Sequence, residues 1–353
     1  MTRRVVVSRT DLSDASISEE PDLDLQQGEV RLRVDLFGLS ANNITYALFG
    51  DALGYWGHFP VDDGRGCIPV WGFADVVESR SELLTAGERV FGYLPMADGF
   101  VLTPAEPTEL GFSDASPHRA ELHPWYARYY RCSADPLWAA SGEELQVSLW
   151  ALFMTGWGLA GQLAETANTV VVSSASSKTA LALAWALRDH PNDVTVVGVT
   201  SDNNAAFVAS TDGYDGVTTY DNLGLSGVTG PVAFVDAAGS PAIKEAVHAA
   251  LGGRLTDSVI LGATHQGGGA AGGSLGGPAP RFFFIPDVAD QTAAELGHAA
   301  YHQTFADAWR RFVPWIEDKL EVTSGQGPEG IVDAYRTVLA GGLGPEVATV
   351  LRW

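Results

Sequence analysis

The residues best suited to chemistry in this sequence form a turn of small and polar side chains. An apolar run, Val170–Val172, precedes the turn, and small side chains follow at Ser174, Ser177 and Ala180. A strand that enters a tight turn at a helix N-terminus directs backbone N–H groups and the positive end of the helix dipole at an anion such as a pyrophosphate. The candidate phosphate-binding residues are Ser174, Ala175, Ser176, Ser177, Lys178 and Thr179.

Dinucleotide folds usually carry glycines with this spacing, and this turn has none. Hydroxyl groups and the ammonium group of Lys178, one of three lysines in the chain, could supply the contacts that a glycine turn makes through its backbone. A serine-rich loop that merely caps a helix is the alternative interpretation.

The end of the next apolar strand bears on which dinucleotide the turn would hold. Thr200 and Ser201 stand where NAD-binding folds carry an acid for the adenine ribose, and Asp202 follows them. Hydroxyls tolerate a 2′-phosphate better than a carboxylate does, so the sequence favours NADP over NAD, although the usual arginine is missing. The further cofactor-binding candidates are Thr200, Ser201, Asn204, Tyr220, Gly262 and Thr264.

Histidines are the next candidates, for acid–base chemistry. His265 follows a predicted strand at 259–262, so it would lie at the carboxyl end of a sheet, where ligands of such folds bind. A catalytic role and a structural role are both open for it. His298 and His302 share a helix face, but no Glu follows His298 as a zinc helix requires, so we interpret both as surface or packing residues.

An aromatic segment with two arginines also has a pattern of interest. Tyr126, Tyr129 and Tyr130 have helical spacing, which predicts a stripe of rings along a helix. Packing is one interpretation of this segment. The other is that Arg128 and Arg131 meet an anionic substrate or a cofactor phosphate.

The elements that must position these residues divide the chain in two. Roughly the first 145 residues consist of short segments with period-two alternation, such as Gly28–Leu36, which indicates a β-rich barrel or sandwich. From about Ser148 onward, apolar runs alternate with helix-length segments, which predicts βαβ units and a parallel sheet. The strands expected there are 168–172, 194–199, 232–236, 259–262 and 282–285, with helices at 179–188, 241–251 and 289–315, and the chain is expected to end with a helix at 329–339 and a strand at 347–353.

Composition limits the classes of partner. The chain has 353 residues, of which 46% are hydrophobic, and its 21 Lys+Arg against 43 Asp+Glu give a net charge of −22. Such a charge repels nucleic acid and anionic membranes. Cys67 and Cys132 fit buried thiols in a reducing compartment, and we find neither a signal peptide nor an apolar run of membrane-spanning length, so we expect a cytoplasmic protein.

Three segments resemble those of a known family. Gly28–Thr45, with Gly-Leu-Ser-Ala-Asn-Asn at 38–43, resembles the opening barrel of the medium-chain dehydrogenase/reductases, in particular their zinc-free quinone-oxidoreductase and enoyl-reductase branch. Gly87–Gly92 is similar to the G-D-R-V-x-G turn of that superfamily, and Asp236–Gly239 to its D-x-x-G segment. The resemblance covers nearly the whole chain and is closest to a divergent bacterial branch.

This resemblance implies an α/β fold with two domains. They are a GroES-like catalytic domain at 1–147 and 317–353 and a doubly wound, Rossmann-type domain at 148–316. Enoyl-reductase relatives carry a proton-donating tyrosine near a glycine, and Tyr55 matches it loosely here. The neighbouring polar candidates are Tyr46, Asn42 and Asn43, and each of these residues could instead be a buried hydrogen-bonding group.

Zinc is not expected, because Asn42-Asn43 and Trp71–Ala74 stand where that superfamily carries its Cys and Gly-His-Glu ligands. The expected function is zinc-independent hydride transfer between NADP(H) and a small carbonyl or activated-alkene substrate in an interdomain cleft. The alternative is a lyase, an isomerase or a ligand-binding scaffold that has lost redox activity. The expected partner is a small-molecule substrate, with no nucleic acid and no membrane, and a homodimer is left open.

Overall fold

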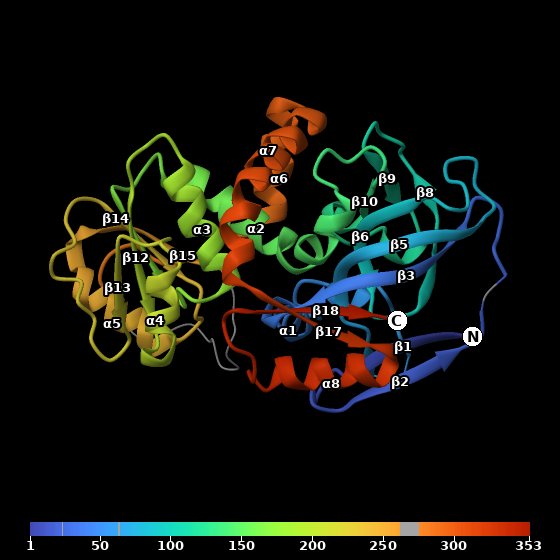
Figure 1. Cartoon of the computed structure of the whole chain (residues 1–353), viewed down its shortest axis with the longest axis horizontal. Helices are drawn as coiled ribbons and strands as arrows, with labels where there is room; N and C mark the ends of the chain where they lie inside the picture. The colour runs from blue at the N-terminus through green and yellow to red at the C-terminus, as the bar shows by residue number, and fades with distance from the viewer. Residues whose placement is uncertain (23, 63, 262–274) are drawn as a thin grey trace. The chain divides into compact units, whose positions relative to one another are not determined.

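The computed structural model describes residues 1–22, 24–62, 64–261 and 275–353, and the chain divides into two units. The β-rich unit comprises Met1–Trp150 and Ala293–Trp353, and the parallel-sheet unit comprises Ala151–Thr292. In Figure 1 the labelled strands of the parallel-sheet unit alternate with helices, whereas those of the β-rich unit follow one another. This is the expected α/β class.

The β-rich unit is built on two sheets, a small one of order β2-β1-β4 and a large one of order β17-β18-β3-β5-β6-β10-β9-β8, with β7 paired to β3. β18 is antiparallel to β3, with Val350 opposite Gly38, so the last strand of the chain joins a sheet begun near its start. The strands are β1 (Thr2–Ser8), β2 (Ala15–Glu20), β3 (Val30–Leu39), β4 (Arg65–Gly66), β5 (Pro69–Ser79), β6 (Arg89–Pro95), β7 (Gly99–Leu102), β8 (Pro104–Ala105), β9 (Gly111–Asp114), β10 (Arg128–Arg131), β17 (Glu321–Gln326) and β18 (Val347–Arg352).

Helices and short 3₁₀ turns connect these strands. α1 begins with a capping box in which the side chains of Ser40 and Asn43 bond each other's backbone N–H groups. No helix in the described ranges has both the length and the apolar character needed to cross a bilayer. The helical elements are α1 (Ala41–Leu48), η1 (Tyr55–Gly57), η2 (Pro117–Arg119), η3 (Pro124–Ala127), η4 (Ala140–Gly142), α2 (Glu143–Leu163), which continues into the parallel-sheet unit, α7 (His298–Ile316), η6 (Glu317–Lys319) and α8 (Gly327–Leu339).

The parallel-sheet unit contains a sheet of order β13-β12-β11-β14-β15-β16, with parallel pairing throughout. Numbered within the unit, the order is 3-2-1-4-5-6, which is the order of dinucleotide-binding folds. Its elements are β11 (Thr169–Ser173), α3 (Lys178–Asp189), β12 (Thr195–Thr200), α4 (Asp202–Ser210), β13 (Gly216–Thr219), β14 (Val232–Asp236), α5 (Pro241–Leu251), η5 (Gly252–Arg254), β15 (Leu255–Ile260), β16 (Arg281–Phe282) and α6 (Ile285–Leu296).

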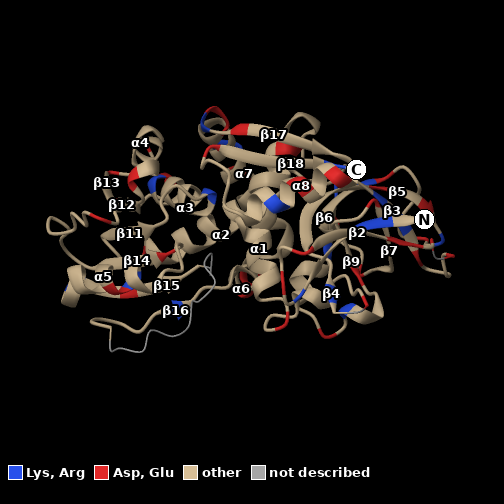
Figure 2. Cartoon of the chain, turned by 90° about the horizontal axis from the view of Figure 1, so that it is seen from below, with Lys and Arg blue, Asp and Glu red and all other residues tan. Residues whose placement is uncertain are grey.

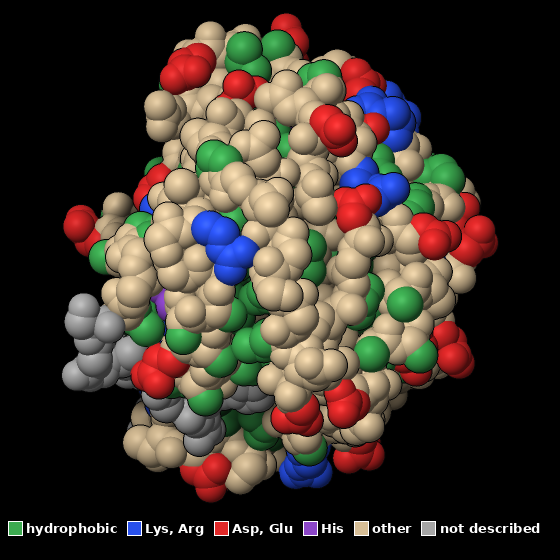
Figure 3. Space-filling model, turned by 90° about the vertical axis from the view of Figure 1, so that its left-hand side faces the viewer, with side chains coloured by type: hydrophobic (Ala, Val, Ile, Leu, Met, Phe, Trp, Pro, Cys, Tyr) green, Lys and Arg blue, Asp and Glu red, His purple; other side chains and the backbone are tan. Residues whose placement is uncertain are grey.

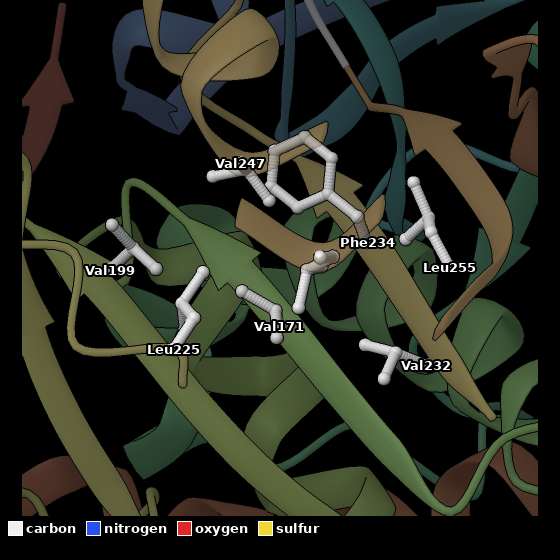
Figure 4. Close-up of a cluster of buried hydrophobic side chains, with 8 residues drawn as sticks. Val171, Val199, Leu225, Val232, Phe234, Val247 and Leu255 are labelled. Atoms are coloured by element: carbon white, nitrogen blue, oxygen red, sulfur yellow. The ribbon is translucent and has the colours of Figure 1, made fainter. Parts of the chain in front are cut away.

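The central strands β11 and β14 are buried along their whole length, which explains their uninterrupted apolar sequences. Figure 4 shows Val171 and Phe234 on these strands, with Val247 of α5 close to the Phe234 ring; all three belong to one buried cluster. Burying side chains of this size contributes about 1.5–3 kcal/mol each. This core holds the strand ends, and therefore the loops that follow them, in register.

Three predicted elements were wrong. Tyr126 lies in η3 and Tyr129 lies on β10, where it pairs with Gly92 of β6 and Phe112 of β9, so the tyrosines do not form a helical stripe. The expected buried strand at 282–285 is instead the two-residue exposed edge strand β16, followed by α6. The single helix expected at 289–315 is interrupted at Gly297, whose φ of 88° ends α6 and precedes α7.

The division of the chain assigns α7 to the β-rich unit, whereas the expected boundary lies after this helix. A buried polar contact accounts for the difference. Nε2 of His302 lies 2.8 Å from Oδ1 of Asp135, and the His302 ring stacks on Tyr130 with centroids 4.5 Å apart. His302 is therefore a packing residue, as its sequence context indicated.

Acidic side chains outnumber basic ones on the face of the molecule shown in Figure 3. On the face in Figure 3, carboxylates are scattered with few basic groups between them. The basic residues near the N-terminus in Figure 2 lie beside acidic ones, and Arg3, for example, pairs with Asp98 at 2.9 Å.

Candidate functional site

The turn after β11 has the shape of a phosphate loop although it has no glycine. Ser174 adopts a left-handed backbone with φ of 50°, a conformation that glycine normally supplies. The N–H of Ala175 donates to the carbonyl of Val199 at 3.1 Å, and the N–H of Ser177 donates back to the Ser174 carbonyl at 2.8 Å. Ser177 caps α3 by accepting from the N–H of Ala180 at 3.3 Å.

Side chains from the next two β–α units hold three consecutive residues of this turn. The hydroxyl of Tyr220 accepts from the N–H of Ser174 at 3.0 Å. The hydroxyl of Tyr214 donates to the carbonyl of Ala175 at 2.8 Å, and Nδ2 of Asn204 donates to Oγ of Ser176 at 3.0 Å. Polar side chains therefore fix a backbone that a glycine turn would leave free to adapt.

Two of the supporting residues were not among the sequence candidates. A Cβ on Gly198 of β12 would lie 2.9 Å from Cβ of Ala175 and 3.0 Å from the Tyr214 ring. Glycine is therefore needed at this position, where the turn packs closely against β12. The glycine within an otherwise apolar strand was the available signal for this close approach. Nothing in the sequence indicated Tyr214, since the link depends on the tertiary fold.

The N-terminus of α3 keeps donors for a ligand. In the described part of the chain, no group accepts a hydrogen bond from the N–H of Ser176 or of Thr179. These groups and the positive end of the helix dipole favour an anion. Lys178 is the first residue of α3, so its ammonium group adds positive charge to the same end.

The residues after β12 lie next to this turn. Thr200 is buried, and its carbonyl accepts from the N–H of Tyr220 at 2.9 Å, which joins the ends of β12 and β13. Ser201 stands at the N-cap of α4 without a side-chain cap bond. Asp202 is exposed in the first turn of α4, where its carboxylate complements the helix dipole.

A buried aspartate, Asp236, lies at the end of β14, where the strand order of the sheet reverses between β11 and β14. Oγ of Ser173 donates to Oδ1 of Asp236 at 2.9 Å and accepts the N–H groups of Ala237 and Ala238 at 3.1 Å each. The same carboxylate oxygen accepts from the N–H of Gly239 at 3.0 Å. The Asp-Ala-Ala-Gly segment thus shapes the loop after β14.

The β-rich unit contains a second group of candidates, Tyr46, Tyr55 and Tyr126, which lie in a buried aromatic cluster whose remaining rings are those of His58 and Tyr93. The hydroxyls of Tyr55 and Tyr126 lie 3.0 Å apart in a hydrogen bond, and the rings of Tyr46 and Tyr55 are 4.7 Å apart. The structure therefore brings two sequence candidates together and adds Tyr126, which the helical-stripe interpretation had treated as packing.

Burial determines the protonation states in this cluster. It raises the pKa of Tyr46 and of Tyr55, although the hydrogen bond from Tyr126 partly opposes the shift at Tyr55. Burial, assisted by the positive charge of Arg119, lowers the pKa of His58 to about 3. Near pH 7, Tyr46 and Tyr55 are therefore protonated and the His58 imidazole is neutral.

Both polar atoms of the Asn43 side chain hydrogen-bond to the backbone within the β-rich unit. Its Oδ1 accepts from the N–H of Ser40 at 2.9 Å and its Nδ2 donates to the carbonyl of Pro69 at 3.0 Å. The side chain of Asn42, by contrast, hydrogen-bonds to Tyr46.

The remaining candidates divide between residues with known contacts and residues outside the described ranges. Arg131 bonds Glu88 and the carbonyl of Leu83, and Arg128 lies over the Trp125 ring at 5.0 Å.

Within the described ranges, no three His, Cys, Asp or Glu side chains are grouped so as to hold a metal ion. Gly262, Thr264 and His265 lie outside the described residues.

Comparison with solved structures gives matches over the whole chain. CurA from Vibrio vulnificus in complex with NADPH has a TM-score of 0.64 at 16% identity, covering 99% of this chain and 98% of that chain. The quinone oxidoreductase from Coxiella burnetii has a TM-score of 0.55 at 13% identity, covering 100% and 99%. The Etr1p/NADP/crotonyl-CoA complex has a TM-score of 0.60 at 10% identity, also covering 100% and 99%.

These likenesses confirm the expected fold, a GroES-like unit with a Rossmann-type unit. No curated protein matches the sequence. Residues 37–344 match the family described as "Protein of unknown function (DUF2855)". The chain belongs to this family, and its fold is that of the solved structures named above.

Proposed function

We propose that this chain is an NADP(H)-dependent oxidoreductase that works without zinc on a small carbonyl or activated-alkene substrate. The observation that carries the proposal is the turn after β11, which combines a left-handed Ser174 with open N–H groups at Ser176 and Thr179. The turn lies beside the reversal point of a sheet with the dinucleotide-binding strand order.

The residues of the turn fit a dinucleotide phosphate. The N–H groups of Ser176 and Thr179, with the Lys178 ammonium group, would bind the pyrophosphate. The Tyr220 hydroxyl accepts from the N–H of Ser174 and also hydrogen-bonds to the Ser174 side chain, so it helps to hold the turn that would bind the phosphate. When bound at this turn, NADP(H) would provide the hydride chemistry.

NADP is preferred to NAD in this proposal because hydroxyls line the end of β12. Ser201 makes no side-chain cap bond and can donate to a 2′-phosphate. Asp202 is exposed in the first turn of α4. Neutral donors bind a phosphate without the repulsion that an inward carboxylate would add.

The proton step is assigned to Tyr55. A buried phenol with a raised pKa stays protonated near neutral pH and can donate its proton to a carbonyl oxygen or an α-carbon. His58, with a pKa of about 3, is neutral under the same conditions and does not compete as an acid. This division of roles needs no metal to polarise the substrate.

The proposal is tested by following NADPH oxidation at 340 nm with 1,4-benzoquinone and with crotonyl-CoA. Turnover that is saturable in one of these substrates is expected, and it should persist after exhaustive dialysis against a zinc chelator. Loss of turnover on dialysis and its recovery with zinc would contradict the zinc-free part of the proposal.

One observation favours the non-redox alternative. Protein groups already accept from the N–H of Ser174 and of Ala175, so the turn offers fewer free donors than a glycine turn does. A lyase, isomerase or ligand-binding scaffold of this fold would have no need for the full set of free backbone N–H donors. NADPH binding without reduction of any carbonyl or alkene would support this alternative.

A further inference from the structure

We propose that Tyr126 is the positioning residue for the proton donor, holding the Tyr55 hydroxyl and returning a proton to it after each transfer. This inference rests on the proposed function, because it assigns a partner to the donor named there. The carrying observation is the buried hydrogen bond between the two hydroxyls, 3.0 Å long.

Tyr126 is the one described residue whose side chain hydrogen-bonds to the Tyr55 hydroxyl. The other two tyrosines of the aromatic cluster lie close but bond elsewhere or not at all. The Tyr46 hydroxyl accepts from Nε1 of Trp71 at 3.3 Å. The buried Tyr93 hydroxyl has no hydrogen-bond partner in the described part of the chain.

The hydroxyls of Tyr55 and Tyr126 together carry the protons that this transfer requires. Two phenols that share one hydrogen bond use one proton between them and keep the other. When Tyr126 donates to Tyr55, the proton of Tyr55 is the one available to a substrate. The phenolate that forms on Tyr55 then accepts a charge-assisted hydrogen bond, which is stronger than the bond between neutral hydroxyls.

The backbone of Tyr126 is anchored as a positioning residue requires. Nη1 of Arg119 donates to the Tyr126 carbonyl at 3.1 Å. Arg119 is buried and pairs with Asp114 at 3.0 Å, and both side chains are at most 2% exposed. A fully buried ion pair resists displacement because separating its charges is costly. The Tyr126 ring also packs against Tyr93, with centroids 4.7 Å apart.

The proton transfer balances without any further co-reactant. The O–H bond of Tyr55 breaks, and its proton bonds to the substrate atom that has become electron-rich. The phenolate of Tyr55 then takes the proton of Tyr126, and solvent water reprotonates Tyr126. No electrons are exchanged with either tyrosine.

The test compares Tyr126→Phe, Tyr55→Phe and the double variant, with Tyr93→Phe as the matched control from the same cluster. We expect Tyr126→Phe to lower kcat about tenfold, the effect of one lost hydrogen bond, while KM and NADPH affinity stay unchanged. Tyr93→Phe should leave kcat within about twofold of wild type, because its hydroxyl bonds neither tyrosine. In the Tyr55→Phe background, adding Tyr126→Phe should have no further effect.

The assay is NADPH oxidation with 1,4-benzoquinone and crotonyl-CoA, paired with an NADPH fluorescence titration and urea unfolding of each variant. Additive losses in the double variant, or a Tyr126→Phe enzyme with wild-type kcat, would overturn the inference. NADPH binding without reduction of either substrate would also overturn it. A wild type that binds no NADPH would instead refute the proposed function. If Tyr126→Phe fails to fold, Arg119→Lys, which weakens the anchor of Tyr126, should lower kcat in the same direction.

Discussion

At the scale of single residues, Ser174 shows how a cofactor turn can be built without glycine. Its left-handed backbone costs about 1–2 kcal/mol in an L-residue, and the bond from its N–H to Tyr220 helps offset that cost. The same bond occupies the N–H of Ser174, so this backbone group is not available to a ligand.

Lys178 decides whether this turn binds phosphate or only begins a helix. A charge-assisted contact contributes roughly 1.5–3 kcal/mol, so Lys178→Ala should weaken NADPH binding about tenfold to a hundredfold. Lys244→Ala on α5 is the matched control and should leave the affinity unchanged. Fluorescence titration measures both. Unchanged affinity in Lys178→Ala, with unchanged thermal stability, would show that this lysine does not touch the cofactor.

At the scale of elements, the turn and its neighbouring strand depend on each other. Gly198→Ala places a Cβ 2.9 Å from Cβ of Ala175, so the turn must shift. We expect about 1–3 kcal/mol of lost stability together with weaker NADPH binding. In the adjacent strand β13, a Cβ on Gly216 would meet nothing within 4 Å, so Gly216→Ala is the control. Urea unfolding and titration of both variants check this, and equal behaviour would contradict the close approach.

The contact between α7 and the β-rich unit gives a second prediction at this scale. His302→Leu removes the side-chain hydrogen bond to the buried Asp135 carboxylate, which should cost about 1–3 kcal/mol. His298 lies at an exposed position of the same helix and provides the control. His298→Leu should change the free energy of unfolding by less than about 0.5 kcal/mol. Thermal unfolding distinguishes the two. A small effect at His302 would contradict a stabilising role of this contact for α7.

Elements were predictable from the sequence where one physical signal dominated. The uninterrupted apolar runs of β11 and β14 reflect burial on both faces of the sheet, so both strands could be predicted from the sequence. β17 was missed because its residues are exposed or half-buried, so no alternation marks it. β10 was read as helix because tyrosines three and four apart satisfy a helical pattern, while its pairing with β6 and β9 is a long-range contact.

The candidate site was predictable to a smaller extent. The turn residues were found because small and polar types follow one strand. Their supports, Tyr214 and Gly198, are 39 and 23 residues from Ala175 in sequence and meet it through the sheet. Tyr55 and Tyr126 are 71 residues apart, and no local pattern joins them. Contacts of this kind require the fold.

At the scale of the whole molecule, His58 links the aromatic cluster to acid stability. Its pKa is lowered to about 3, so between pH 6.5 and 3 the unfolded chain binds a proton there that the folded chain does not. Stability is therefore lost as pH falls through this range, by up to about 1.4 kcal/mol per pH unit. His58→Phe should unfold in urea with a shallower dependence on pH between 6 and 4. Parallel slopes for wild type and variant would contradict a buried neutral histidine.

The central claim is that this chain binds NADP(H) through the turn after β11, and a fluorescence titration of the wild type with NADPH and with NADH tests it most directly. We predict saturable NADPH binding, at least several-fold tighter than NADH binding, because Ser201 rather than an acid follows β12. Equal affinities, or a preference for NADH, would mean that the carboxylate of Asp202 reaches the ribose. Binding of neither dinucleotide would contradict the claim itself and leave the turn as a helix cap.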